Sequence, residues 1–165
     1  MIIWLASYPK SGNTWLRSLI ANYYFSETGD FNFELLEKID SFPSNKYFRK
    51  YLDKFKQPHD TSKYWIKEQE KINQSKGLKF FKTHNALCKI EGNQFTNKEN
   101  TLGVIYIIRD PRNVITSLKN HFSIDDDKEA LDNILYVIQL EGDTFCTQGR
   151  QGNTRRAGLS SISNI

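Results

Sequence analysis

Short apolar runs alternate with helical patterns along the chain, in the order typical of strands and helices around a parallel sheet. The run at 2–6 predicts a buried strand, and positions 15–24 repeat apolar residues at helical spacing. Two further apolar runs, at 78–82 and 103–108, predict a second and a third strand. Strands that alternate with helices favour right-handed crossovers and a covered parallel sheet. The pattern therefore predicts an α/β fold in three α/β/α layers, with helices on both faces of the sheet.

Three helical patches fill the long stretch between the first two predicted strands. One covers residues 33–39 and ends before Pro43, and the next covers residues 47–55 and ends before Pro58. The last covers residues 65–72. Their many aromatic side chains are expected to pack in the core or in a lid, and an acceptor pocket is the alternative.

Another helix is predicted directly after the third strand. Asp110 is a good N-cap, and Pro111 suits the first helical position. A further helical pattern covers residues 131–138, whereas residues 149–165 are rich in Gly, Ser, Asn, Thr and Arg and predict a disordered tail. We therefore expect an α/β domain at 1–148 and an atypical tail after it.

Composition is typical of a soluble globular protein, because 38% of the 165 residues are hydrophobic and 25% are charged. Of the +4 net charge, three Arg in the tail supply +3, so the domain itself gives weak grounds for nucleic-acid binding. Cys88 and Cys146 lack metal or C-x-x-C spacing and are expected to be reduced. No apolar run approaches the roughly 20 residues of a membrane span, and no signal peptide is evident. A cytoplasmic location is the default expectation.

An anion-binding turn is predicted between the first strand and the first helix. The segment reads Tyr8-Pro9-Lys10-Ser11-Gly12-Asn13-Thr14-Trp15. The first N–H groups of a helix have no internal partner, and the helix dipole adds positive potential, so a phosphate is bound well there. Lys10 adds a full charge, Ser11 and Thr14 add hydroxyl donors, and Gly12 permits close approach of the backbone. The arrangement is P-loop-like, although its Lys precedes the Gly, unlike the ATP-type loop.

This segment resembles the 5′-phosphosulfate-binding loop of sulfotransferases that use 3′-phosphoadenosine 5′-phosphosulfate (PAPS). The usual family pattern is Tyr-Pro-Lys-Ser-Gly-Thr-Thr-Trp, and the chain departs from it at Asn13, whose side chain can still donate a hydrogen bond. The resemblance implies that Lys10 to Trp15 bind the nucleotide. In the family, the matching Trp contacts the adenine ring; core packing under the first helix is the alternative for Trp15.

Two more segments resemble motifs of the same family. Arg109 ends the third predicted strand and Ser117 lies in the next helix, as in the family's 3′-phosphate-binding segment; a salt bridge is the alternative for Arg109. Lys82-Thr83-His84 ends the second predicted strand, where the family places a catalytic His base. All three motifs therefore follow predicted strands, and ligands of such folds bind at the carboxyl ends of strands. We expect one shared site.

The resemblance implies in-line transfer of a sulfuryl group from PAPS to a hydroxyl or amine, leaving 3′-phosphoadenosine 5′-phosphate. His84 would take the acceptor's proton, and Lys10 and Lys82 would stabilise the leaving phosphate. No metal is expected. A small molecule or a glycan is the expected acceptor, and a homodimer is left open.

Family chains usually continue further and carry an Arg-Lys-Gly segment that this sequence lacks, so the chain is expected to be truncated at its C-terminal end. Two alternatives follow from that difference and from the loop. One is a non-catalytic nucleotide-binding fragment, and the other is a kinase-like phosphotransferase.

Overall fold

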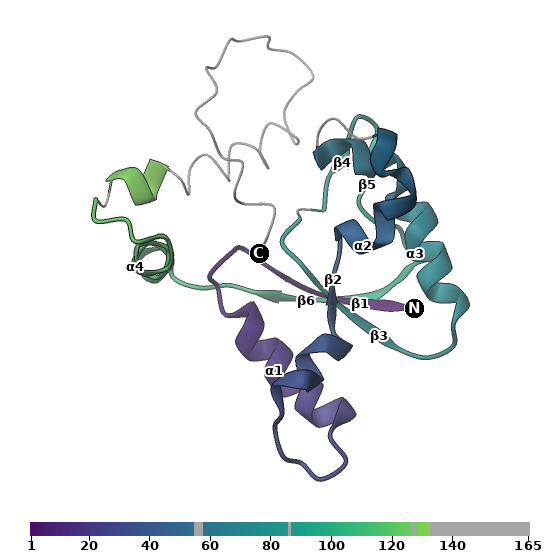
Figure 1. Ribbon diagram of the computed structural model, residues 1–165, viewed down its shortest axis with the longest axis horizontal. Coiled ribbons are helices and arrows are strands. Elements are labelled where there is room, and N and C mark those ends of the chain that lie inside the picture. The colour runs from purple at the N-terminus through teal and green to yellow at the C-terminus, as the bar shows by residue number, and fades with distance from the viewer. Residues whose placement is uncertain (55–57, 86, 127, 133–165) are drawn as a thin grey trace.

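A four-stranded parallel sheet lies at the centre of the computed structural model, which describes residues 1–54, 58–85, 87–126 and 128–132 (Figure 1). The strands are β1 (Ile2–Ser7), β2 (Asp40–Ser41), β3 (Lys79–Thr83) and β6 (Thr101–Ile107). Their order is β2-β3-β1-β6, and every neighbouring pair is parallel. The predicted α/β class is therefore confirmed, and the three strands predicted from apolar runs lie within two residues of their expected bounds.

Helical segments cover both faces of this sheet, as the layered prediction requires (Figure 1). One face carries α1 (Asn13–Phe25) and the 3-10 helix η1 (Phe33–Lys38). The other carries α2 (Asn45–Phe48), the 3-10 helices η2 (Arg49–Lys54) and η3 (Pro58–Tyr64), and α3 (Trp65–Gln74). The fourth α-helix, α4 (Pro111–Phe122), follows β6. A two-stranded antiparallel hairpin pairs β4 (Lys89–Ile90) with β5 (Asn93–Gln94).

The alternation of side chains along β1 divides the core into two parts. Ile2 and Trp4 face the α2 and α3 side, whereas Leu5 packs with Ala21 of α1 on the other side. The Trp4 ring lies 5.7, 6.0 and 5.0 Å from the rings of Phe42, Phe81 and Phe95 respectively. Its indole N–H donates to Thr101 Oγ1 at 2.9 Å, so the central strand is joined to β6 by a side chain as well as by the ladder.

Helix α4 begins as the sequence predicts. The side chain of Asp110 accepts a hydrogen bond from the backbone N–H of Arg112 at 2.9 Å, and Pro111 occupies the first turn, where a missing N–H costs nothing. The predicted helix at 131–138 lies almost entirely outside the described residues, and the predicted tail at 149–165 lies entirely outside them.

Several local predictions were wrong. Strand β2 was not expected, because two residues carry no periodicity, and its pairing with β3 is a tertiary contact. Pro58 starts a 3-10 helix instead of only ending the previous one. Residues 93–94 carry no strand pattern either, yet they form β5, because Glu91 and Gly92, with φ of 50° and 81°, form a tight reversal between two strands.

The apolar face expected on α1 is only partly buried. Leu16 and Ile20 pack against the core, but Trp15, Leu19 and Tyr23 are exposed. These three lie at four-residue intervals and so form a separate stripe, which a count of apolar residues alone merges with the packed one.

We predict that Trp4→Ala lowers the free energy of unfolding by about 3–5 kcal/mol, because it removes a buried ring from the centre of the core. Urea denaturation followed by circular dichroism measures this loss. Tyr23→Ala is the matched control, since Tyr23 is 83% exposed and its removal should change stability by less than about 0.5 kcal/mol. Equal losses in the two variants would contradict this picture of the core.

Candidate active site

The turn between β1 and α1 has the backbone conformation of an anion-binding loop. Lys10 and Gly12 both have left-handed φ values, 64° and 100°, and such turns occur in the backbone nests that bind anions. Within the described residues, the N–H groups of 13–15 have no backbone acceptor, because the helical ladder starts with Leu16 N–H donating to Gly12 O at 3.1 Å. A Cβ on Gly12 would meet no atom within 4 Å, so the loop is open on that side.

The two lysines of the predicted site belong to neighbouring strands and the turn that follows one of them. Lys82 of β3 pairs in register with Leu5 of β1, and Lys10 lies in the turn after β1. The Lys82 side chain is only 9% exposed and lies on the same face of β3 as Phe80, which packs under α1. Burial lowers the pKa of Lys82, and the positive charges of Arg17 and Lys10 lower it further. The three cations therefore form one electrostatically coupled group.

His84 follows β3 and is oriented by the last residue of β1. Its Nδ1 lies 2.7 Å from the carbonyl oxygen of Ser7 and 3.3 Å from Ser7 Oγ. A carbonyl oxygen only accepts, so Nδ1 carries the hydrogen, and the neutral ring keeps its lone pair on Nε2. Burial lowers the pKa of His84; the bond to Ser7 opposes this, and the charges of Lys82 and Arg17 add to it. A neutral imidazole with a free Nε2 is the form that a general base needs.

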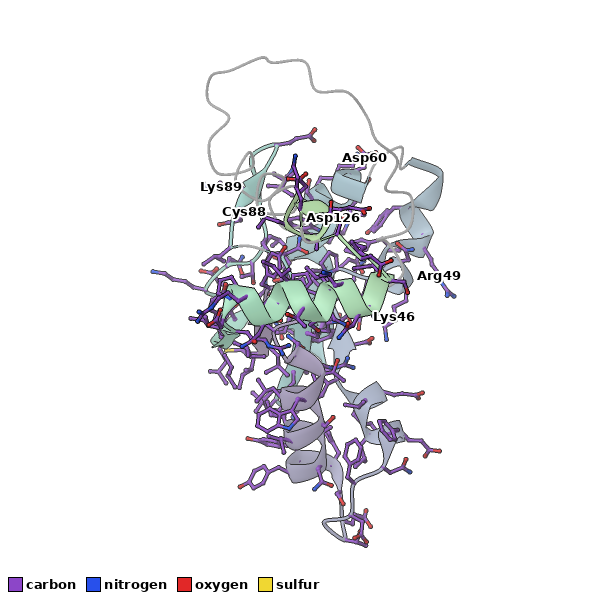
Figure 2. All side chains as sticks on the ribbon, turned by 90° about the vertical axis from the view of Figure 1, so that its left-hand side faces the viewer. Lys46, Arg49, Asp60, Cys88, Lys89 and Asp126 are labelled. Carbon is purple, nitrogen blue, oxygen red and sulfur yellow. The ribbon has the colours of Figure 1, made fainter. Side chains whose placement is uncertain are left out.

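Arg109 joins the third motif to the loop. It lies two residues beyond β6, and its guanidinium donates to the carbonyl oxygen of Lys10 at 2.9 Å. Helix α4, which carries the half-buried Ser117, packs its Val114 and Leu118 with Tyr8 of the loop segment. Figure 2 shows α4 lying across this edge of the sheet with α1 below it in the view. The three predicted motifs thus meet at the carboxyl edge, where Arg109, within the described residues, contacts a backbone carbonyl rather than the carboxylate of a salt bridge.

Two loop residues have side chains in contrasting environments. Trp15 is 70% exposed at the start of α1, so the alternative of core packing is wrong. Asn13 is 4% exposed, and its amide nitrogen donates inward, to Leu5 O at 2.8 Å and to Ser7 Oγ at 3.1 Å. The amide nitrogen of Asn13 is thus engaged within the fold, and its backbone N–H is the donor that has no backbone acceptor among the described residues.

Sequence reasoning missed Ser7 and Arg17. Arg17 lies one helical turn after Asn13, and its guanidinium donates to the carbonyl oxygens of Leu36 and Ile39 at 2.9 and 2.6 Å. Burial lowers the pKa of Arg17, while the charge of Asp40 acts in the opposite direction. The sequence signal for Arg17 was its place four positions after Asn13 on a half-buried helix. For Ser7 the sequence held no signal beyond its place at the end of a strand.

Other chemistry is not evident in the part of the chain that the structure describes. Within it, no three His, Cys, Asp or Glu side chains gather closely enough to hold a metal ion. The same residues include no helix long and apolar enough to cross a membrane.

A comparison with models of protein families gives a match that covers most of the chain. The model of a family described as "Sulfotransferase domain" matches residues 2–151. That range includes the loop, the segment around His84 and the segment from Arg109 to Ser117. Searches of curated proteins and of solved structures found no match.

The lowered pKa of His84 predicts a dependence of stability on pH. The unfolded imidazole titrates near 6.5, so as pH falls through that value the unfolded state binds a proton that the folded state resists. The wild type should therefore lose stability relative to His84→Gln between pH 7.5 and 5.5, by at most about 1.4 kcal/mol per pH unit. Urea denaturation of both proteins at the two pH values measures this difference. If the wild type instead gained stability relative to His84→Gln as pH falls, the assignment of a neutral imidazole would be wrong.

Proposed function

The chain belongs to the sulfotransferase domain family, and on that basis we propose that it transfers a sulfuryl group from PAPS to a hydroxyl or amine acceptor. The observation that carries the proposal is the meeting of Lys10, Lys82, His84 and Arg109 at one edge of the sheet. A cationic loop beside a neutral imidazole supplies both halves of the reaction: charge stabilisation for a leaving phosphate and a proton acceptor for a nucleophile.

The residues of the loop suit the anionic end of PAPS. Backbone N–H groups without an acceptor, an open face over Gly12 and the nearby charge of Lys10 all favour a phosphate or sulfate there. The exposed guanidinium of Arg109 and the hydroxyl of Ser117 on α4 would bind the 3′-phosphate, since a guanidinium fork matches a phosphate dianion. The exposed indole of Trp15 offers a flat surface for the adenine ring.

Three side chains would act in the transfer, for which PAPS supplies the sulfuryl group. His84 accepts the acceptor's proton at Nε2, because its Nδ1 hydrogen is held by Ser7 O. Lys10 and Lys82 place positive charge where negative charge develops on the leaving oxygen. The buried position of Lys82 strengthens this effect, since a charge removed from water interacts more strongly with a developing anion.

The lowered pKa of Lys82 adds a second argument for an anionic ligand. Burial is the main cause of the lowered pKa of Lys82, and the positive charges of Arg17 and Lys10 disfavour its ammonium form further, although Asp40 offsets part of the charge of Arg17. An anion bound among these side chains relieves that repulsion and restores the ammonium form. The proposed site therefore gains in two ways from a phosphosulfate, by direct hydrogen bonds and by relief of repulsion.

Calorimetric titration with 3′-phosphoadenosine 5′-phosphate, in parallel with ATP and Mg²⁺, tests the proposal. We expect the bisphosphate to bind and ATP–Mg²⁺ to bind at least tenfold more weakly, because ATP has no 3′-phosphate for Arg109 and Ser117. Preference for ATP–Mg²⁺ would support a kinase-like phosphotransferase instead. Binding of neither nucleotide by the folded protein would support the non-catalytic alternative.

Substitution at two positions should separate the base from the phosphate ligands. His84→Ala is expected to reduce transfer by a factor of about 10²–10⁴ while nucleotide affinity stays nearly unchanged, because the proton acceptor does not bind the phosphates. Lys10→Ala should lower both nucleotide affinity and turnover, because Lys10 would bind the phosphosulfate in the ground state and in the transition state. Turnover by a radiolabelled-sulfate assay and affinity by calorimetry give the two readouts. Full transfer activity in His84→Ala would assign the base to another group.

A further inference from the structure

A chain of hydrogen bonds connects the start of α1 with the imidazole of His84. Asn13 uses both hydrogens of its amide nitrogen, one for Leu5 O at 2.8 Å and the other for Ser7 Oγ at 3.1 Å. Ser7 in turn presents its carbonyl oxygen at 2.7 Å and its hydroxyl oxygen at 3.3 Å to His84 Nδ1. The chain thus crosses from α1 through the end of β1 to the residue after β3.

The three groups are well enclosed, so their polar atoms depend on one another. Asn13 and Ser7 are 4% and 3% exposed, and His84 is half-buried. A buried hydroxyl without a fixed partner rotates toward whichever acceptor is nearest, and a buried carbonyl without a donor is costly. By donating to both Leu5 O and Ser7 Oγ, Asn13 fixes the end of β1 in the arrangement that receives the His84 ring.

The carbonyl oxygen of Ser7, which can only accept, decides which tautomer His84 adopts. With Nδ1 carrying the hydrogen, both oxygens of Ser7 accept from it and Nε2 keeps its lone pair. If the end of β1 were no longer held by Asn13, the carbonyl could turn away and the Ser7 hydroxyl could donate to Nδ1, and the hydrogen of the neutral ring would move to Nε2. A ring in that second form has no lone pair at Nε2 and cannot accept a proton there.

We infer that Asn13 and Ser7 are positioning residues for His84, which keep its neutral ring in the Nδ1–H form with Nε2 free. The inference rests on the proposed function, in which Nε2 is the proton acceptor. It assigns Asn13, the position where the loop departs from the usual family pattern, to the base rather than to the nucleotide. Asn13 then belongs to the loop that would bind the phosphosulfate and also positions His84, which would take the proton.

NMR of the full chain labelled with ¹⁵N-histidine tests this directly, because long-range ¹H–¹⁵N correlations distinguish the two tautomers. At pH 7.5 the wild type should show His84 mainly as Nδ1–H, with the signal assigned by its absence in His84→Gln. Asn13→Ala should shift the ratio of the tautomers toward Nε2–H by roughly five- to tenfold, the effect of about one neutral hydrogen bond. Ser7→Ala, which removes the hydroxyl but keeps the carbonyl, should leave Nδ1–H dominant in an otherwise wild-type chain.

Asn22→Ala is the matched control. Asn22 lies on the same helix and its amide also donates to a backbone carbonyl, that of Gly29 at 3.0 Å, but it has no contact with Ser7 or His84. A purely structural role for Asn13 would lower stability in both Asn variants and leave the tautomer ratio of His84 unchanged. That result would overturn the inference, and an Nε2–H tautomer in the wild type would overturn it even if Asn13→Ala failed to fold.

The kinetic consequence separates the inference from the proposed function. In Asn13→Ala, kcat should fall about as much as the Nδ1–H population falls, while calorimetric affinity for 3′-phosphoadenosine 5′-phosphate stays within about twofold of the wild type. A shifted tautomer in a protein that binds no bisphosphate would support the positioning role and refute the sulfotransferase site. Bisphosphate binding with an unchanged tautomer ratio in Asn13→Ala would support the sulfotransferase site and refute the positioning role.

Discussion

The pairing of β1 with both of its neighbours is the constraint on which the candidate site depends. Because β3 and β6 run parallel to β1 and in register with it, their carboxyl ends meet at one edge. Lys82 is opposite Leu5, and Ile107 is opposite Ser7. The residues that follow each strand therefore lie close together in space although they are distant in the sequence. The bond from Arg109 to Lys10 O, between residues 99 positions apart, follows from this register.

Positive charge gathered at that edge is a cost that the rest of the fold must offset. Lys82 is buried beside Arg17 and Lys10, and each of these cations disfavours the charged state of Lys82. Among the described residues, Asp40 is the acid whose charge acts on Arg17, and it also binds Tyr47 and Lys46. Burial raises the pKa of Tyr47, and its hydrogen bond to Asp40 raises it further, which keeps that phenol neutral. Such an excess of positive charge is what the proposed binding of an anion would offset.

Sequence reasoning succeeded where local signals and global topology agree. Local patterns predicted the apolar runs of β1, β3 and β6, the N-cap at Asp110 and the motifs after each strand. The alternation of strands with helices predicted that the strands run parallel. Sequence reasoning failed where tertiary contacts decide. The two residues of β2 are a strand only because β3 lies beside them, and the exposed stripe of Trp15, Leu19 and Tyr23 has the same composition as a buried one. The direction of the Asn13 side chain was likewise invisible, since an amide donates equally well to a phosphate and to a carbonyl.

That ambiguity at Asn13 has a physical resolution in the structure. A Thr at this position has one hydroxyl hydrogen and cannot donate to two oxygens, whereas the amide of Asn has two hydrogens and satisfies Leu5 O and Ser7 Oγ at once. The longer Asn side chain also reaches back past the turn to the end of β1, which a β-branched hydroxyl at the first position of α1 does not. Asn13 therefore links the loop to the end of β1, whose Ser7 contacts the ring of His84. The proposed phosphate binding rests on the backbone N–H groups of the turn and on the charge of Lys10, and neither depends on the side chain at position 13.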